Sequence, residues 1–135
     1  YCFRIIFGCG ITVMAKILVV DDSPTQQEAL RRLLIKQGHE VIIANNGLQG
    51  IEIAKRENPP LILVDIVMPE INGFQATRQL SSDPDTASIP VVIVSTKDQS
   101  FDRTYGLRQG AKGYLTKPPS EQELLDTIQP LLKAS

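Results

Sequence analysis

Ile17-Leu18-Val19-Val20, followed directly by Asp21-Asp22, is the stretch that decides the fold. Four consecutive apolar residues indicate a strand buried on both faces, because a strand with one solvated face would alternate apolar and polar residues. Similar runs recur along the chain with helical patterns between them, at Val41–Ala44, Leu61–Val64, Val91–Val94 and, more weakly, Lys112–Leu115. This alternation predicts an α/β fold with an open parallel sheet, helices on both faces and the first, third and fourth runs at its centre.

The segments between the runs carry helix signals. Ser23-Pro24-Thr25-Gln26 has the pattern of a capping box with proline in the first turn, and Gly38 is expected to end that helix. Further helices are expected near Asn46-Gly47, near Asn72-Gly73, over 98–109 and from a second capping box, Ser120 to Glu123. Residues expected on the inner faces of the five helices, in chain order, are Ala29, Leu30, Leu33 and Leu34; Leu48, Ile51 and Ala54; Phe74, Thr77 and Leu80; Phe101, Tyr105 and Leu107; and Leu124, Leu125, Ile128 and Leu132.

Prolines at two places and the N-terminal segment interrupt these patterns. Asn58-Pro59-Pro60 is expected to stop the second helix, and Pro130 is expected to kink or end the last helix near Gln129. Residues 1–13 are rich in Ile, Phe and Cys and differ in character from the rest of the chain, whereas Met14 has the character of a natural start. We therefore expect a non-native N-terminal extension over 1–13 and one domain over 14–135.

The composition narrows the class of protein. The chain has 135 residues, 42% of them hydrophobic, and a formal net charge of -1, which fits one globular domain and provides no basic surface for nucleic acid or an anionic membrane. Both cysteines, Cys2 and Cys9, precede residue 10, and they form no CxxC pair. We therefore expect no disulfide framework, and we expect a cytoplasmic location. The apolar runs are too short to span a bilayer.

Acidic, hydroxyl and basic side chains lie at the ends of four predicted strands. Asp21-Asp22 follows the first, Asp65 the third, Ser95 the fourth and Lys117 the fifth. The carboxyl ends of parallel strands share one edge of a sheet, where ligands bind in open α/β folds. Clustered carboxylates repel one another unless a cation compensates, and oxygen ligands suit Mg²⁺. Taken singly, each residue has a simpler role as a turn former, helix cap or solvated side chain; taken together, they indicate aspartyl-phosphate chemistry.

Five segments in this order resemble the receiver domains of two-component response regulators, the CheY-like family, over residues 14–135. The segments are Ile17–Ser23, Leu63–Pro69, Asn72–Phe74, Pro90–Ser95 and Gly110–Pro118. The resemblance implies a flavodoxin-like (βα)5 fold, in which a doubly wound, parallel five-stranded sheet has the strand order 2-1-3-4-5. The sequence segments around Val67–Leu80 and Ser95–Gln99 are similar to those of single-domain receivers of type IV pilus (twitching motility) systems, of the PilH kind.

The resemblance also implies the chemistry of the site. Asp65 would be the phosphoacceptor and would form an aspartyl phosphate. Mg²⁺ would be held by the side chains of Asp22 and Asp65 and by the backbone carbonyl of Val67, with Asp21 acting through water. Lys117 would pair with the phosphoryl group. Since Val67 offers no polar group to orient an attacking water, we expect slow dephosphorylation, and no enzymatic activity beyond the domain's own phosphotransfer.

The resemblance further implies a switch and its partners. Ser95 would swing toward the phosphoryl group and Tyr114 would turn inward after it. This would remodel a protein-docking surface made by the helix over 98–109, the strand over 112–115 and the helix from Ser120. A CheA-like histidine kinase would be the phosphodonor and a downstream protein the output, with no nucleic acid or membrane involved.

Two other interpretations remain open. A small Mg²⁺-dependent phosphohydrolase with an aspartyl intermediate usually carries a D-x-D pattern after its first strand, whereas this chain has Asp21-Asp22-Ser23. A receiver that is never phosphorylated and serves as a scaffold is the third interpretation. Phosphorylation of Asp65 distinguishes the three.

Overall fold

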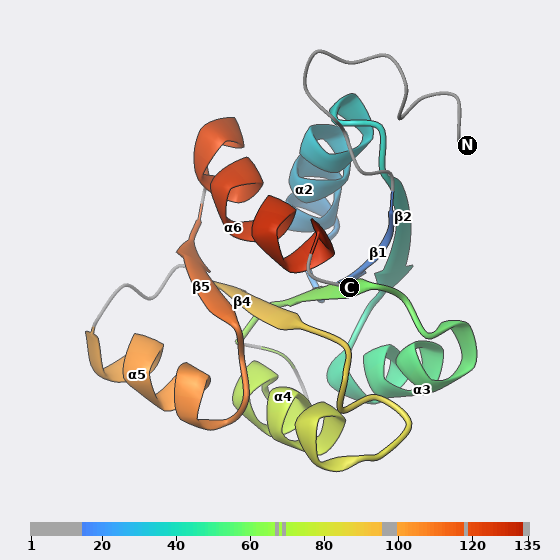
Figure 1. The fold of residues 1–135 in the computed structure, drawn as a ribbon, viewed down its shortest axis with the longest axis vertical. Helices are drawn as coiled ribbons and strands as arrows, with labels where there is room; N and C mark the ends of the chain where they lie inside the picture. The colour runs from blue at the N-terminus through green and yellow to red at the C-terminus, as the bar shows by residue number, and fades with distance from the viewer. Residues whose placement is uncertain (1–14, 67, 69, 96–99, 118, 134–135) are drawn as a thin grey trace.

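The computed structural model describes residues 15–66, 68, 70–95, 100–117 and 119–133, with the side chains of 100–102 and 133 left aside. Strands and helices alternate along the chain (Figure 1). The elements are β1 (Lys16–Val20), α2 (Pro24–Lys36), β2 (Glu40–Ala44), α3 (Gly47–Glu57), β3 (Leu61–Val64), α4 (Gly73–Ser82), β4 (Val91–Ser95), α5 (Ser100–Arg108), β5 (Gly113–Thr116) and α6 (Glu121–Lys133). The expected extension over 1–13 lies outside the described residues.

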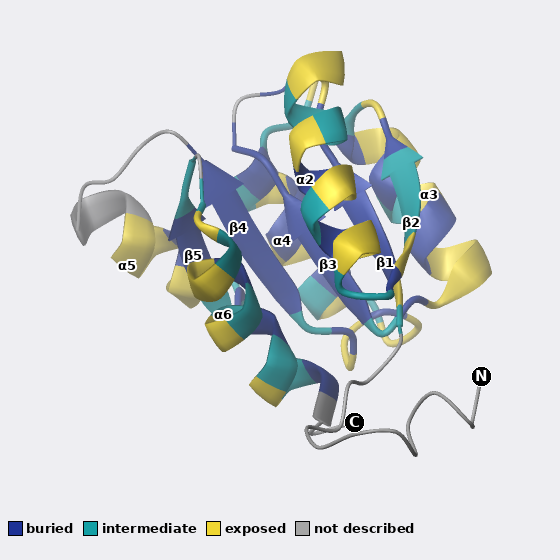
Figure 2. Ribbon diagram, turned by 90° about the horizontal axis from the view of Figure 1, so that it is seen from above, coloured by how far each residue is buried: buried dark blue, intermediate teal, exposed yellow. Residues whose placement is uncertain are grey.

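The five strands form one parallel sheet in the order β2-β1-β3-β4-β5, as predicted. Every residue of β3 and β4 is buried, and so is β1 after Lys16, whereas β2 and β5 contain partly exposed residues. Figure 2 shows this contrast between the buried centre and the more exposed edge of the sheet. The continuous apolar runs therefore mark the central strands, because only these strands are covered on both faces and on both edges.

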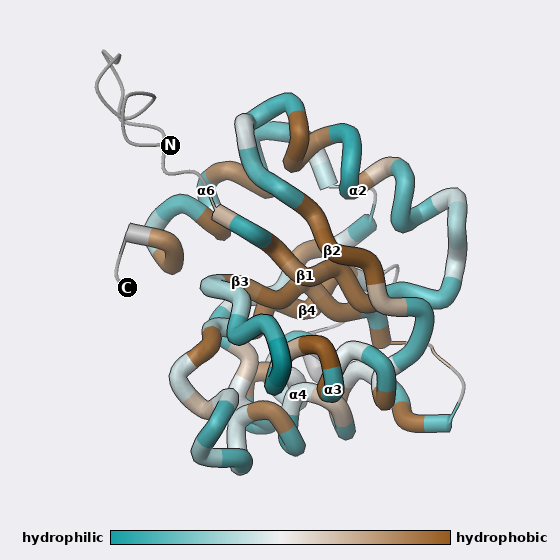
Figure 3. Tube along the Cα trace, turned by 90° about the vertical axis from the view of Figure 1, so that its right-hand side faces the viewer, coloured by the Kyte–Doolittle hydropathy of each residue, from teal (hydrophilic) through white to brown (hydrophobic). Residues whose placement is uncertain are grey.

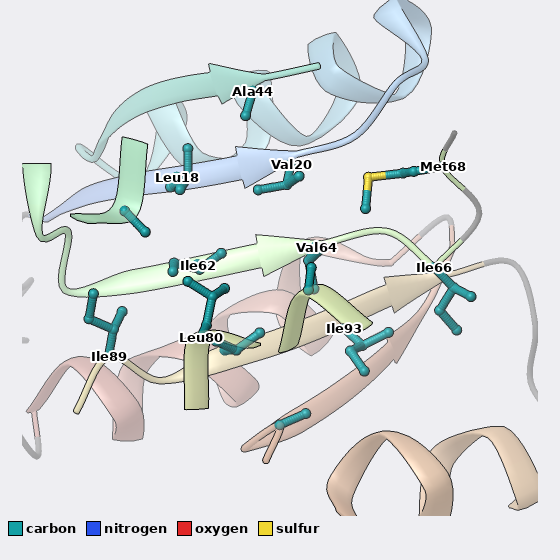
Figure 4. Close-up of a cluster of buried hydrophobic side chains, with 14 of the residues drawn as sticks. Leu18, Val20, Ala44, Ile62, Val64, Ile66, Met68, Leu80, Ile89 and Ile93 are labelled. Carbon is teal, nitrogen blue, oxygen red and sulfur yellow. The ribbon is translucent and has the colours of Figure 1, made fainter. Parts of the chain in front are cut away.

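Helices cover the sheet in two layers, with α2 and α6 on one face and α3, α4 and α5 on the other (Figure 1). Successive residues of a strand face opposite layers. Ile17 and Val19 pack in a cluster with residues of α2 and α6, whereas Leu18 and Val20 pack with residues of α3 and α4. Figure 4 shows the second cluster, which extends to Ile66 and Met68 just beyond β3. The hydropathy of the trace follows this division, with apolar strands inside and polar helix faces outside (Figure 3).

Most helix ends lie where the sequence places them. The side-chain oxygens of Ser23, Asn46 and Asn72 accept hydrogen bonds from the third residue of α2, α3 and α4, respectively. Ser120 and Glu123 form the second predicted capping box, with reciprocal bonds of 3.1 Å. The first predicted box is only half formed, because the Gln26 side chain does not reach the backbone N–H of Ser23, which is donated to Asp21 Oδ1 instead.

The sequence predicted that Pro130 would kink or end the last helix near Gln129, but the helix does not end there. Instead α6 continues through it to Lys133. Proline removes one backbone donor and crowds the preceding turn, which costs about 3 kcal/mol in a helix interior. Leu132 is 4% exposed and Ile128 is fully buried in the cluster between α6 and the sheet. Burial of such side chains, at about 1.5–3 kcal/mol each, offsets this cost and keeps the last turn helical.

Four residues predicted to face the core are exposed: Ala29 on α2, Leu48 on α3, and Tyr105 and Leu107 on α5. Leu48 is 47% exposed, whereas Gly47 and Gly50 in the same turn of α3 are buried, so Leu48 lies on the outer side of this helix. In that helix Ala54 is buried, as predicted, and Ile53 is buried as well. Helical spacing alone predicted that these apolar residues are buried. They are exposed because the rotation of each helix about its axis turns another face toward the sheet.

His39 lies at the edge of the sheet opposite Asp21, where β1 and β2 begin, and it is buried rather than solvated. Its Nδ1 accepts a 3.1 Å hydrogen bond from the backbone N–H of Ala15, and burial lowers the pKa of its imidazole. The histidine therefore serves the structure of this edge. Among the described residues, no helix is long and apolar enough to cross a bilayer.

Candidate functional site

The acidic residues meet at the carboxyl edge of the sheet. The backbone N–H of Asp65 donates to the carbonyl of Val20 at 2.9 Å, and that of Asp21 to the carbonyl of Ala44 at 3.0 Å. These bonds extend the strand ladders by one residue and fix the acids at neighbouring strand ends. One carboxylate oxygen each from Asp21, Asp22 and Asp65 lies within 4.8 Å of the others. The topology therefore brings the three predicted acids together.

Lys117 is the basic residue of this cluster. Its Nζ donates to Asp21 Oδ2 at 2.5 Å and lies 3.3 Å from Asp65 Oδ1, and its side chain is only 6% exposed. The loop after β5 is held in place because the backbone N–H of Lys117 donates to the carbonyl of Ser95 at 2.7 Å. Lys117 thus pairs with Asp21 and Asp65, and among the described residues the three carboxylates of the cluster outnumber this one ammonium.

Burial dominates the electrostatics of Asp65. Loss of solvent raises the pKa of its carboxyl above the ordinary value for aspartate, and the neighbouring Asp21 raises it further. The Lys117 ammonium and the backbone N–H of Ile66 act in the opposite direction. An added cation would favour the ionised form, because nearby positive charge stabilises a carboxylate. Asp65 is thus a partly desolvated carboxylate, which is the state expected of an oxygen nucleophile.

Asp21 is the most constrained of the three acids, since it is 1% exposed. Its Oδ1 accepts from the backbone N–H of Ser23 at 2.9 Å, and its Oδ2 accepts from Lys117. Asp22, in contrast, is exposed and lies at the open side of the cluster. The two adjacent acids therefore differ in their environment, with one held by protein donors and the other free to take a ligand.

The loop after β3 is held close to Asp65 by Gly73, the glycine predicted at the start of the third helix. The Gly73 N–H donates to the carbonyl of Ile66 at 2.9 Å. A Cβ added to Gly73 would lie 2.2 Å from the backbone oxygen of Asp65, which is closer than any real contact. Only glycine allows α4 to begin against the nucleophile. The Asn72-Gly73 pair was the signal for this, because asparagine caps the helix and glycine follows it.

The two predicted switch residues lie on the neighbouring strands. Ser95 is fully buried at the end of β4, and it pairs with Thr116 of β5. Tyr114 is 6% exposed, so its ring already points into the fold. Arg103 of α5 donates to the Tyr114 carbonyl at 3.2 Å, and its guanidinium carbon lies 5.1 Å from the ring centroid. Val67, whose carbonyl is a predicted metal ligand, lies outside the described residues.

A family model for the response regulator receiver domain matches residues 17–129. The chain is a response regulator receiver domain. It is 56% identical over 119 residues to the protein PilH of Pseudomonas aeruginosa, an alignment that covers 88% of this chain and 98% of that relative. This receiver therefore belongs to the family that its motifs indicated, and its similarity to PilH spans nearly the whole relative.

Solved structures agree with this assignment. The chemotaxis protein CheY4 of Vibrio cholerae has 28% sequence identity and a TM-score of 0.81, with 88% of this chain and 99% of that chain covered. The receiver domain of a sensor histidine kinase from Pseudomonas aeruginosa has 27% identity and a TM-score of 0.82, with 90% and 99% covered. That second structure holds a magnesium ion coordinated in its active site cleft.

The residues of this receiver fit a magnesium ion. All the candidate ligands among the described residues are carboxylate oxygens, the atoms that Mg²⁺ prefers. In the described part of the site three carboxylates stand against one ammonium, so a divalent cation would relieve the remaining repulsion. Asp22 is exposed, so this ligand is accessible to an ion from solvent.

Proposed function

We propose that this receiver is a phosphoacceptor switch in which Asp65 takes a phosphoryl group with Mg²⁺ present. The observation that carries the proposal is the clustering of Asp21, Asp22 and Asp65 with the Lys117 ammonium at one sheet edge. A histidine kinase is the phosphodonor, as for receivers in two-component systems. The similarity to PilH supports a CheA-like kinase and a role in type IV pilus signalling.

The transfer uses groups of this chain. A carboxylate oxygen of Asp65 attacks the phosphorus of a phosphohistidine, a new P–O bond forms, and the P–N bond breaks as the imidazole nitrogen keeps the bonding pair and takes a proton from solvent. Lys117 lies 3.3 Å from Asp65 Oδ1, where its ammonium stabilises negative charge on the transferred group. The product is an aspartyl phosphate, which water cleaves in a slow second step.

Mg²⁺ would be held by the side chains of Asp22 and Asp65 and by the backbone carbonyl of Val67, with Asp21 acting through water. When bound, the metal neutralises charge on the phosphoryl oxygens. The direct bonds of Asp21 to Ser23 and Lys117 support an indirect role for this residue, because both its side-chain oxygens already accept protein hydrogen bonds.

The phosphoryl group acts by shifting a population between two states. Ser95 and Lys117 contact it, and Tyr114 stays inward in the phosphorylated state. The surface formed by α5, β5 and α6 then binds a downstream protein in the cytoplasm. The burial of Ser95 and Tyr114 on adjacent strands supports this coupling, since a change at one has a short path to the other.

The test is phosphorylation by acetyl phosphate, measured as intact mass with and without Mg²⁺. We expect a Mg²⁺-dependent gain of about 80 Da, one phosphoryl group on the nucleophile, in the wild type only. Asp65→Asn keeps the shape of the side chain but removes the nucleophile, and it should show no gain. Labelling of Asp65→Asn would contradict the assignment of Asp65 as the phosphoacceptor. No labelling of folded wild type would favour a scaffold, and rapid turnover of the donor would favour a phosphohydrolase.

A further inference from the structure

A neutral side chain from α2 contacts the lysine of the site. Gln26 is partly buried, and its Oε1 accepts a hydrogen bond from Lys117 Nζ. The same ammonium donates to Asp21 Oδ2 at 2.5 Å and lies 3.3 Å from Asp65 Oδ1. An ammonium has three N–H donors and no acceptor, so these three oxygens match its full set of donors.

Gln26 is available for this contact because it does not close its capping box. Glutamine at the third helical position commonly accepts from the backbone N–H of the N-cap. Gln75 of α4 does so, at 2.9 Å from the N–H of Asn72. In α2 the N–H of Ser23 is donated to Asp21 Oδ1 instead. A carboxylate of the site thus replaces the glutamine in the cap, and the glutamine turns to the lysine.

We propose that Gln26 is a positioning residue for phosphoryl transfer and that it acts through Lys117. The inference rests on the proposed role of Asp65 as the phosphoacceptor. Of the three contacts of the ammonium, that with Asp65 is the longest. Gln26 and Asp21 therefore hold the lysine firmly from one side, and its remaining donor faces the nucleophile, where phosphoryl oxygens arrive.

An amide suits this position better than a charged or apolar group. A carboxylate would add a fourth negative charge to the cluster and oppose its ionisation. An apolar side chain would leave one N–H of a buried ammonium without a partner, and the flexible lysine would then leave its place beside Asp65 to find one. Gln26 thus fixes the direction of Lys117 without changing the net charge of the site.

The expected effect is on rate, because Lys117 and Asp65 both remain without Gln26. With acetyl phosphate, an Asp65 oxygen attacks phosphorus, the P–O bond to acetate breaks, and acetate leaves with the bonding pair. The ammonium stabilises the charge on the transferred oxygens only if it is held in place. Since a hydrogen bond to a charged group is lost, we expect transfer about tenfold slower.

The experiment compares Gln26→Met with Gln75→Met. Both remove a glutamine acceptor from the third position of a helix, but only Gln26 contacts Lys117. Initial rates of labelling by acetyl phosphate are measured by intact mass at saturating Mg²⁺. We expect Gln26→Met to be about tenfold slower than wild type and Gln75→Met to be unchanged, since a bond to a charged group is lost only at Gln26.

A double-mutant cycle separates positioning from a general structural effect. In a Lys117→Met background, Gln26→Met should cause no further slowing, because its target is already absent. Equal slowing in both backgrounds, or a wild-type rate for Gln26→Met alone, would overturn the inference. Failure of the wild type to label would instead contradict the proposed function of Asp65, so the two failures are distinguishable.

Discussion

Lys117→Met should destabilise the metal-free protein strongly, because it removes the one cation seen among the buried carboxylates of the described site. Lys117 is 6% exposed and contacts Asp21, which is 1% exposed, at 2.5 Å. Removing one partner of a buried ion pair typically costs 3–5 kcal/mol. Asp65 can relieve part of this by taking up a proton, since its pKa is already raised. We therefore expect a loss near the low end, about 3 kcal/mol.

The assay is thermal unfolding at pH 7 with and without Mg²⁺. A loss of about 3 kcal/mol should lower the melting temperature by ~10 °C in a domain of this size. Mg²⁺ should then raise the melting temperature of Lys117→Met more than that of the wild type, because the metal supplies the missing positive charge. At a hundredfold excess over Kd, bound ligand adds about 2.7 kcal/mol, so the metal should recover most of the loss.

Lys55→Met is the matched control. Lys55 forms an ion pair of 2.9 Å with Asp83, but its side chain is 48% exposed. The same substitution there should leave the melting temperature nearly unchanged, since water solvates both charges in either case. If Lys117→Met melted like the wild type without metal and responded equally to Mg²⁺, the claim that Lys117 compensates the carboxylates would be refuted.

Three further predictions concern residues outside the direct contacts of Lys117. Burial lowers the pKa of His39 in the folded state, so the unfolded protein binds more protons below pH ~6.5. The stability of the wild type should therefore fall as the pH drops from 6.5 toward the folded pKa. In His39→Asn, melting curves should show a smaller loss over the same pH range. Gly73→Ala would place a Cβ 2.2 Å from the Asp65 carbonyl oxygen. It should lower the stability by roughly 2 kcal/mol or more and slow labelling by acetyl phosphate. An unchanged melting temperature and labelling rate would show that the loop can move to accommodate the methyl group. Pro130→Ala should raise stability by about 2 kcal/mol in chemical denaturation, since an exposed position inside α6 regains a backbone donor, and a loss of stability would contradict the continuous helix.

Local sequence signals predicted the framework because they depend on short-range physics. Continuous apolar runs identified the three central strands, since burial on both faces excludes polar residues. Capping residues located the helix starts, because a side-chain oxygen must satisfy the first free N–H groups. The convergence of Asp21, Asp22 and Asp65 followed from the same reasoning, since parallel strands end at one edge.

Long-range contacts decided what the local patterns could not. Leu48 is exposed and Pro130 lies inside a helix because the docking of α3 and α6 on the sheet outweighs helical spacing and proline preference. Gln26 carries a capping signal, yet it binds Lys117, which is 91 residues away in the chain. The sequence by itself determined which elements form and where the acids gather. Only the tertiary structure decided which polar groups pair there, because the acceptors near each donor come from segments that are distant in the sequence and meet only on folding.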